Sequence, residues 1–241
     1  AAFDGVPIED AGKPIALVVR KLVGTVNSDD FIALDLLRGI EHDHLTEPHA
    51  YWLLDSSGDV VPDEKRNRPD SPPLTTLVIG GKLARKTLHD RFEECRSAGG
   101  MGIPVGELLG YVYQLATAID YMNAADHQLG DRRFAIYHRD IRPVNVLLQG
   151  TNVRLGNFSL ARVAQAPVAR VSSDGAGLSP HHAAPETHGG LTTQWSDQYS
   201  LAILYYELRA GRLPVDQSRS SSEVIEIHRQ GKLDWSGLPE P

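Results

Sequence analysis

Cysteine is almost absent from this 241-residue sequence. Cys95 is the only one, so no internal disulfide framework can form. Long apolar runs are absent too, because no stretch approaches the roughly 20 residues that a membrane-spanning helix needs. Basic residues are outnumbered, with 24 Lys and Arg against 31 Asp and Glu and a net charge of −7. This balance leaves no electrostatic footprint for nucleic acid or an anionic membrane surface, so we expect this domain to contact neither.

The residues that are present suffice for a packed domain. Hydrophobic residues make up 41% of the chain, and a chain of this length can bury a sizeable core. No signal peptide opens the sequence, so we expect a soluble, cytoplasmic domain whose parent protein could still be membrane-anchored.

Residues 134–162 hold the most informative pattern. Apolar residues flank a polar turn, Gln149-Gly150-Thr151-Asn152, and this pattern predicts a short hairpin. Polar side chains stand at both ends of it: His138, Arg139, Asp140 and Asn145 before the hairpin, and Asn157 after it. A hairpin that gathers an Asp and carboxamides in this way is typical of a phosphotransfer site, which collects a base and metal ligands from nearby sequence.

The order of short motifs resembles that of protein kinases. The motifs are His138-Arg139-Asp140 with Pro143 and Asn145, Asn157-Phe158-Ser159, Ala184-Pro185-Glu186 and Asp197-Gln198-Tyr199-Ser200. The first resembles the catalytic loop H-R-D-x-x-P-x-N, and the second resembles the metal loop D-F-G. The chain is similar to serine/threonine protein kinases of bacterial type, in a degenerate form. The resemblance implies an α+β, two-lobed kinase-like fold, truncated at both ends so that the glycine-rich loop and the last C-lobe helices are missing.

The resemblance divides the chain into a partial N-lobe, residues 1–81, and an incomplete C-lobe, residues 82–241. Hydrophobic periodicity predicts strands over 14–19, 51–54 and 74–79, and helices over 30–41, 105–123, 197–210 and 223–229, with another starting at Thr87-Leu88. A charged, Pro-rich insertion over 56–73 predicts a mobile surface loop. Gly80-Gly81 stands where kinases have their interlobe hinge and predicts a loose connection.

The resemblance also implies roles for the matching residues. Asp140 would orient the substrate hydroxyl and accept its proton, and Arg142 would present a cation to the transferring phosphoryl group. Asn145 would bind a metal ion. Ala16 and Leu147 match the positions that sandwich adenine.

Five further positions match structural or regulatory residues of the family: His138, Arg139, Phe158, Glu186 and Asp197. Asp197 would bond the backbone of the catalytic loop, and Arg139 would steady the activation segment. Ser179 resembles the small hydroxyl residue of the peptide-positioning segment.

Three ionic positions depart from the kinase pattern. Val18 occupies the nucleotide-site position of the phosphate-gripping lysine, and Ala33 that of its glutamate partner, unless a two-residue slip places Asp35 there instead. Asn157 replaces the metal-binding aspartate. An amide oxygen can still ligate Mg²⁺, but one unit charge pair at about 4 Å is worth roughly 4 kcal/mol at an effective dielectric near 20. Metal binding should therefore be badly weakened.

Several loop residues allow two interpretations. Ser172 and Ser173 are phosphorylation candidates, but solvated loop serines are the preferred interpretation. His42 and His44 have the spacing of a metal pair, yet no third ligand is near, so loop histidines are preferred. We expect His181-His182 to be ordinary loop sequence.

Two functions remain open. The first is a pseudokinase that acts as a binding or regulatory module in signalling, with weak or metal-independent nucleotide binding. The second is a working serine/threonine kinase, a transferase that uses ATP and Mg²⁺ on protein hydroxyls; Arg20 or Lys21 would then replace the missing amine. Either function implies a protein partner, as a substrate or as a regulated protein.

Overall fold

The computed structural model describes residues 2–3, 6–7, 9–10, 13–21, 32, 35–46, 48–65, 68, 70–82, 86–165, 168–170 and 177–238. The chain forms two compact units, one of residues 1–41 and 46–83 and the other of residues 42–45 and 84–241. Small antiparallel sheets and separate helices make up these units, so the predicted α+β class is confirmed. The assignment of the units as two lobes stays a prediction.

The first unit is built around a four-stranded antiparallel sheet with the order β3-β4-β6-β5. Its strands are β3 (Glu9–Asp10), β4 (Lys13–Lys21), β5 (Pro48–Asp55) and β6 (Leu74–Lys82), and a short pair, β1 (Ala2–Phe3) and β2 (Val6–Pro7), precedes them. Apolar side chains of the two adjacent strands β5 and β6 are buried, among them Trp52, Leu53 and Val78. The three predicted strands are therefore present, each longer than expected.

The predicted loose connection at Gly80-Gly81 is wrong, although the first unit ends only two positions later, at residue 83. Both glycines lie inside β6, where Gly80 pairs with Leu17 and Gly81 with Ala16. The ladder with β4 extends through these positions, which the turn preference of glycine did not reveal. Between β5 and β6, the predicted loop contains an isolated bridge between Leu54 and Val60 and the 3-10 helix η1 (Asp63–Lys65).

The predicted helix over 30–41 is described only in part. Residues 35–38 are helical, and Leu36, Leu37 and Ile40 are buried. Phe31, Ala33 and Leu34, together with the predicted cap at Ser28 or Asp29, lie outside the described residues.

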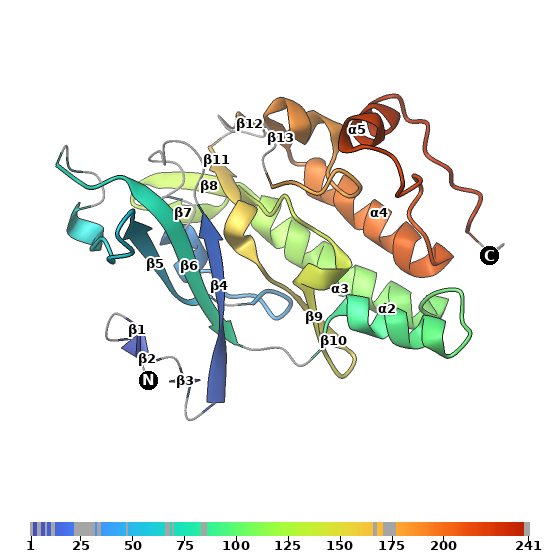
Figure 1. Ribbon diagram of the computed structural model, residues 1–241, viewed down its shortest axis with the longest axis horizontal. Helices are drawn as coiled ribbons and strands as arrows, with labels where there is room; N and C mark the ends of the chain where they lie inside the picture. Colours follow the sequence, from blue (N-terminus) through green and yellow to red (C-terminus); the bar gives the residue numbers. More distant parts are fainter. Residues whose placement is uncertain are drawn as a thin grey trace. The chain divides into compact units, whose positions relative to one another are not determined.

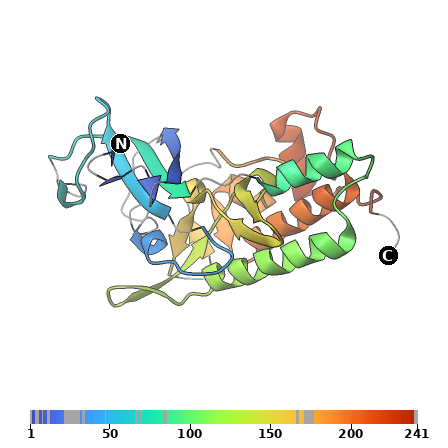
Figure 2. The same ribbon diagram turned by 90° about the horizontal axis from the view of Figure 1, so that it is seen from below.

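The second unit contains the helices α2 (Leu88–Ser97), α3 (Val105–Asn123), α4 (Ser196–Ala210) and α5 (Ser221–Arg229). Thr87 caps α2 reciprocally with Asp90, which explains why the helix starts there. Figures 1 and 2 show α2, α3 and α4 lying side by side, and α3 buries Leu108, Leu115 and Ile119 in the core. The four helices predicted for this part of the chain are confirmed.

Short hairpins and 3-10 turns complete the second unit. The predicted hairpin forms between β9 (Val146–Gln149) and β10 (Asn152–Leu155), with Gln149 opposite Asn152. The other elements are β7 (His127–Leu129), β8 (Arg132–Tyr137), β11 (Arg162–Ala164), β12 (Val168–Arg170), β13 (Leu191–Thr193), η2 (Pro143–Asn145), η3 (Phe158–Leu160) and η4 (Pro185–Gly189). Strands β7, β8 and β11 form a three-stranded sheet that the polar sequence before Tyr137 did not predict.

Two glycines set the distance between the end of α4 and the loop before α3. A Cβ atom on Gly102 would lie 2.2 Å from the carbonyl oxygen of Leu208, and one on Gly211 would lie 2.2 Å from that of Met101. The Ile103 amide donates to the same Leu208 oxygen at 2.8 Å. Backbone therefore packs directly on backbone, and no side chain fits between the two segments.

Within the described residues, no helix is both long enough and apolar enough to cross a membrane.

Candidate active site

The loop that precedes the β9–β10 hairpin is anchored by a buried carboxylate on α4. Asp197 is fully buried and accepts the backbone N–H groups of His138 and Arg139, each at 2.9 Å. Arg139 has a positive φ of 68°, a conformation that costs a non-glycine residue free energy unless its surroundings fix it. Asp197 therefore holds the loop in a strained conformation, and this is the contact that the resemblance implied. Burial raises the pKa of Asp197, and the two N–H groups oppose that shift.

His138 acts as a neutral spacer inside the loop. Its ring is completely buried, and burial lowers its pKa to about 4. Nδ1 accepts the backbone N–H of Asp140 at 3.2 Å, so the proton resides on Nε2 and is donated to the carbonyl oxygen of Gly156 at 2.8 Å. The edge of the ring packs against Phe158, with centroids 5.1 Å apart. One side chain thus joins the segments before and after the hairpin.

Asp140, the expected base, is held by two neighbours. Its Oδ2 accepts a hydrogen bond from Asn145 Nδ2 at 2.7 Å. Its Oδ1 lies 3.0 Å from Arg142 Nε, a charge contact whose angles are not those of a hydrogen bond. Burial raises the pKa of Asp140, and the charge of Arg142 only partly offsets this. A carboxyl group with a raised pKa is a better proton acceptor than an exposed one.

The expected metal ligands, Asn145 and Asn157, bond to each other. Asn145 Nδ2 points at two acceptors, the carboxylate and the carbonyl oxygen of Asp140, both at 2.7 Å. Its Oδ1 must therefore face the other way, and there it accepts Asn157 Nδ2 at 3.0 Å. Asn157 adopts the left-handed conformation, φ 62° and ψ 60°, which Asn tolerates better than most residues.

This set of donors does not fit a resident Mg²⁺ ion. Magnesium prefers carboxylate oxygens in octahedral geometry, whereas here the Asn145 oxygen already accepts an N–H group and Asp140 faces Arg142. Among the described residues, no group of three His, Cys, Asp or Glu side chains is arranged to hold a metal ion. The amide of Asn157 instead supplies the hydrogen-bond donor to the Asn145 oxygen.

The residues expected to bind nucleotide belong to different units. Leu147 lies in β9 of the second unit and forms a bridge with Thr87. Ala16 and Val18 lie on β4 of the first unit, opposite Gly81 and Ile79, and their side chains are outside the described residues. Ala33 is outside them as well. Asp35, the alternative partner for a lysine, accepts the Tyr51 hydroxyl at 2.7 Å.

Sequence reasoning missed a chain of hydrogen bonds beside this loop. Ser179 Oγ lies 3.1 Å from His182 Nδ1, and His182 Nε2 lies 2.8 Å from Glu207 Oε2 on α4. The expectation that His182 is ordinary loop sequence is wrong, because the side chain is buried and links the two elements. Its partner Glu207 lies 25 positions away in the sequence, so no local pattern marked it. Glu186 accepts the Ser196 hydroxyl at 2.6 Å.

The preferred interpretation of His42 and His44 agrees with the structure. His44 Nδ1 lies 3.1 Å from the Val153 carbonyl oxygen, while His42 Nδ1 accepts the His44 amide and its ring stacks on Tyr121. Both histidines thus lie in a loop and contribute to packing and hydrogen bonding.

Comparison with known proteins yields one family. The model of the protein kinase domain matches residues 81–237. The L-type lectin-domain containing receptor kinase S.7 of Oryza sativa subsp. japonica is 33% identical over 51% of this chain and 17% of its own length. The LRR receptor-like serine/threonine-protein kinase FEI 2 of Arabidopsis thaliana is 26% identical over 77% and 27%. The serine/threonine-protein kinase GIN4 of Saccharomyces cerevisiae is 32% identical over 53% and 10%.

These relatives are much longer than the chain, which spans between a tenth and about a quarter of their lengths. They support a protein kinase with serine/threonine receptor kinase homologues. None of them is bacterial, so the expectation of a bacterial type of kinase stays a prediction.

Proposed function

The chain belongs to the protein kinase domain family, and on that premise we propose that it is a catalytically impaired, pseudokinase-like module that regulates a protein partner in signalling. One observation carries this proposal: the side chains of Asn145 and Asn157 are hydrogen-bonded to each other at 3.0 Å. Two positions that resemble a metal-binding pair satisfy each other and need no ion.

The hydrogen bond explains why an asparagine is stable at position 157. Asn145 is oriented by the two acceptors of Asp140, so its Oδ1 presents a lone pair toward residue 157. A carboxylate there would place oxygen against oxygen unless a cation lay between them. An amide supplies the N–H group itself, and a buried acceptor that keeps a partner avoids a penalty of about 1–3 kcal/mol.

The residues at the expected nucleotide-binding positions support the same proposal. Val18 and Ala33 remove both members of the ion pair that grips phosphates in kinases, and a lone buried charge would be destabilising. The adenine-packing positions Ala16 and Leu147 remain apolar. We therefore expect nucleotide binding to be weak and to depend little on Mg²⁺.

Thermal-shift titration with ATP, with and without Mg²⁺, tests the proposal. ATP should raise the melting temperature of the wild-type chain only slightly, and Mg²⁺ should raise it further by less than about 1 °C. Asn157→Asp should introduce a clear Mg²⁺-dependent shift, because ligand binding to the folded state stabilises it. Asn152→Asp, an exposed position in the same hairpin, is the matched control. A strong Mg²⁺-dependent shift in the wild type would overturn the proposal.

An active serine/threonine protein kinase is the second candidate, favoured by the Asp140 carboxylate with its raised pKa on an anchored loop. Phosphate transfer from ATP by the parent domain, abolished by Asp140→Asn, would establish it. Arg20, Lys21 or another cation would then perform the role of the lysine.

Repair of the ionic positions separates the two candidates further. Asn157→Asp alone should restore metal affinity but little catalysis. Val18→Lys and Ala33→Glu should help only together, since each alone leaves a charge without its partner. If Val18→Lys alone restores phosphate transfer, Ala33 is not the partner position and the two-residue register slip is supported.

A further inference from the structure

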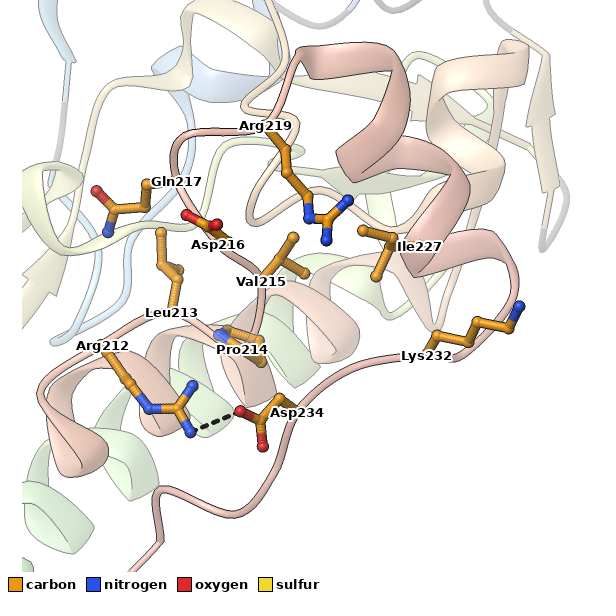
Figure 3. A pocket seen from close by; sticks show the side chains of 10 residues that line it. All are labelled: Arg212, Leu213, Pro214, Val215, Asp216, Gln217, Arg219, Ile227, Lys232 and Asp234. Carbon is orange, nitrogen blue, oxygen red and sulfur yellow. Dashed lines mark hydrogen bonds and ion pairs between the residues drawn. The ribbon is translucent and has the colours of Figure 1, made fainter.

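A pocket of about 540 Å³ lies in the second unit, between the segment after α4 and helix α5. Figure 3 shows its floor of apolar side chains, Pro214, Val215 and Ile227, with Arg219 above them and Arg212 on the opposite wall. Leu213, Pro214 and Val215 are buried. The pocket therefore joins an apolar base to two guanidinium groups.

The acidic residues in the wall are already used. Asp234 pairs with Arg212 at 2.8 Å and accepts the Ser236 amide at 2.9 Å. Asp216 accepts the Ser218 amide at 2.9 Å. The ion pairs of Asp234 and Arg219 are with Arg212 and Glu223, and Lys232 is the third cation in the lining. The hydrogen bonds from Ser218 lower the pKa of Asp216, and the nearby charge of Arg219 adds to that shift.

Arg219 has little structural reason to be where it is. Its one ion pair among the described residues is with Glu223 at 3.9 Å, and the Glu223 carboxylate already bonds the amide and hydroxyl of the cap residue Ser220, at 3.0 and 2.7 Å. Arg219 also directly precedes that cap, at the positive end of the α5 dipole, where a cation is unfavourable by about 0.3–1 kcal/mol. The guanidinium group nevertheless points over the floor of the pocket (Figure 3).

We propose that this pocket docks an acidic segment of a partner protein, with an aliphatic side chain on the Val215–Ile227 floor and a neighbouring carboxylate on Arg219. Charge complementarity selects this occupant. Three cations and two acids line the pocket, and Arg212 is paired with Asp234, so the lining keeps a net charge of +1, with Arg219 and Lys232 as the cations outside that pair. A guanidinium group binds a carboxylate in bidentate geometry, and the apolar floor favours a side chain that a free anion lacks. The proposal concerns residues outside the catalytic loop, so it stands whether or not the domain transfers phosphate.

Fluorescence anisotropy with short labelled peptides tests it. The probe alternates Glu and Leu; companion peptides carry Gln or Lys in place of Glu, Ser in place of Leu, or phosphoserine in place of Glu. We expect the Glu-Leu peptide to bind and the Gln, Lys and Ser versions to bind at least about fivefold more weakly. Tighter binding of the phosphoserine peptide would overturn the assigned occupant.

Arg219, just before the cap of α5, and Arg229, in its last turn, provide a matched pair of variants. Arg219→Gln should weaken Glu-Leu binding at least about fivefold and leave thermal stability unchanged or slightly higher, since a cation leaves the positive end of α5. Arg229→Gln, in the last turn and outside the pocket lining, should leave binding unchanged and lower stability slightly. Equal peptide affinity in wild type and Arg219→Gln would refute the pocket as the binding site. Ile227→Ser tests the floor in the same way.

Discussion

The polar residues before the β9–β10 hairpin differ from those after it in their charge and in their hydrogen-bond partners. Before the hairpin, the loop keeps its charged residues and is anchored from α4 by Asp197, which accepts two backbone N–H groups. After the hairpin, residue 157 is a neutral amide that bonds to Asn145. Hydrogen bonds that hold the backbone and charges that would hold a metal ion are therefore separable in this fold.

The first test of that comparison is Asp197→Asn, which should have the largest effect. An amide offers one acceptor where two N–H groups need two, so its NH₂ group would face a backbone donor. We expect a loss of about 3–4 kcal/mol in the free energy of unfolding, measured by urea denaturation. Asp126→Asn, at an exposed partner of Arg133, should change it by less than about 0.5 kcal/mol. A similar small change at Asp197 would show that the anchor is dispensable.

The second-largest effect is expected from acid, which should lower the free energy of unfolding through the anchored loop. The pKa of His138 is lowered to about 4 by burial, against about 6.5 in the unfolded chain. Between those values the unfolded state binds a proton that the folded state does not, so stability falls as pH falls from 6.5 to 4, by up to about 3 kcal/mol. The raised pKa values of Asp140 and Asp197 act oppositely, since their stabilising effect is lost as pH rises through the folded values.

His138→Gln isolates the histidine contribution from that of the carboxyl groups. The variant should be less stable than wild type at pH 7 but lose less stability between pH 7 and pH 5. Parallel curves for the two proteins would show that His138 does not control the acid response.

Replacing Asn157 by Asp should lower the free energy of unfolding by a smaller amount. Without metal, Asn157→Asp places a carboxylate against the Asn145 oxygen, and we expect a loss of about 1–2 kcal/mol in urea denaturation. Asn152→Asp should lie within about 0.5 kcal/mol of wild type. Together with Asp197→Asn, this would show that each position requires the opposite functional group; an unchanged stability would mean that the amide pair contributes nothing.

The smallest effect is expected from removing the aromatic contact between His138, before the hairpin, and Phe158, after it. Phe158→Leu removes the edge contact with His138 and should cost about 1 kcal/mol in thermal unfolding. Phe92→Leu, a buried position on α2, is the control: it should cost a similar amount but leave the NMR signals of the His138 ring unmoved. Movement of those signals in both variants would argue against a local contact.

Local pattern predicted more of the fold than of the site. The periodicity of 105–123 predicted α3 with its observed ends, and the polar turn at 149–152 predicted the hairpin of β9 and β10. The prediction of a loose connection at Gly80-Gly81 was wrong because a sheet ladder outweighed glycine's turn preference. Strand β8 was not predicted, because polar residues precede its short buried half, Phe134 to Tyr137.

In the site, motif order identified the residues but not their partners. That Asn157 would donate to Asn145 depends on side-chain orientations fixed by Asp140, and no spacing encodes these. The link from Ser179 through His182 to Glu207 joins residues up to 28 positions apart. Such pairings arise from tertiary packing, which a single sequence does not display.

The glycine contact between α4 and the loop before α3 has a consequence for mutational tolerance. Gly102 and Gly211 carry no chemistry, yet a single methyl group on either would collide with a backbone oxygen at 2.2 Å. In a random library selected only for folded protein, both positions should accept almost no substitutions, whereas an exposed position such as Asn152 should accept many. Folding of the domain should therefore tolerate substitution less at these two glycines than at the residues that would perform catalysis.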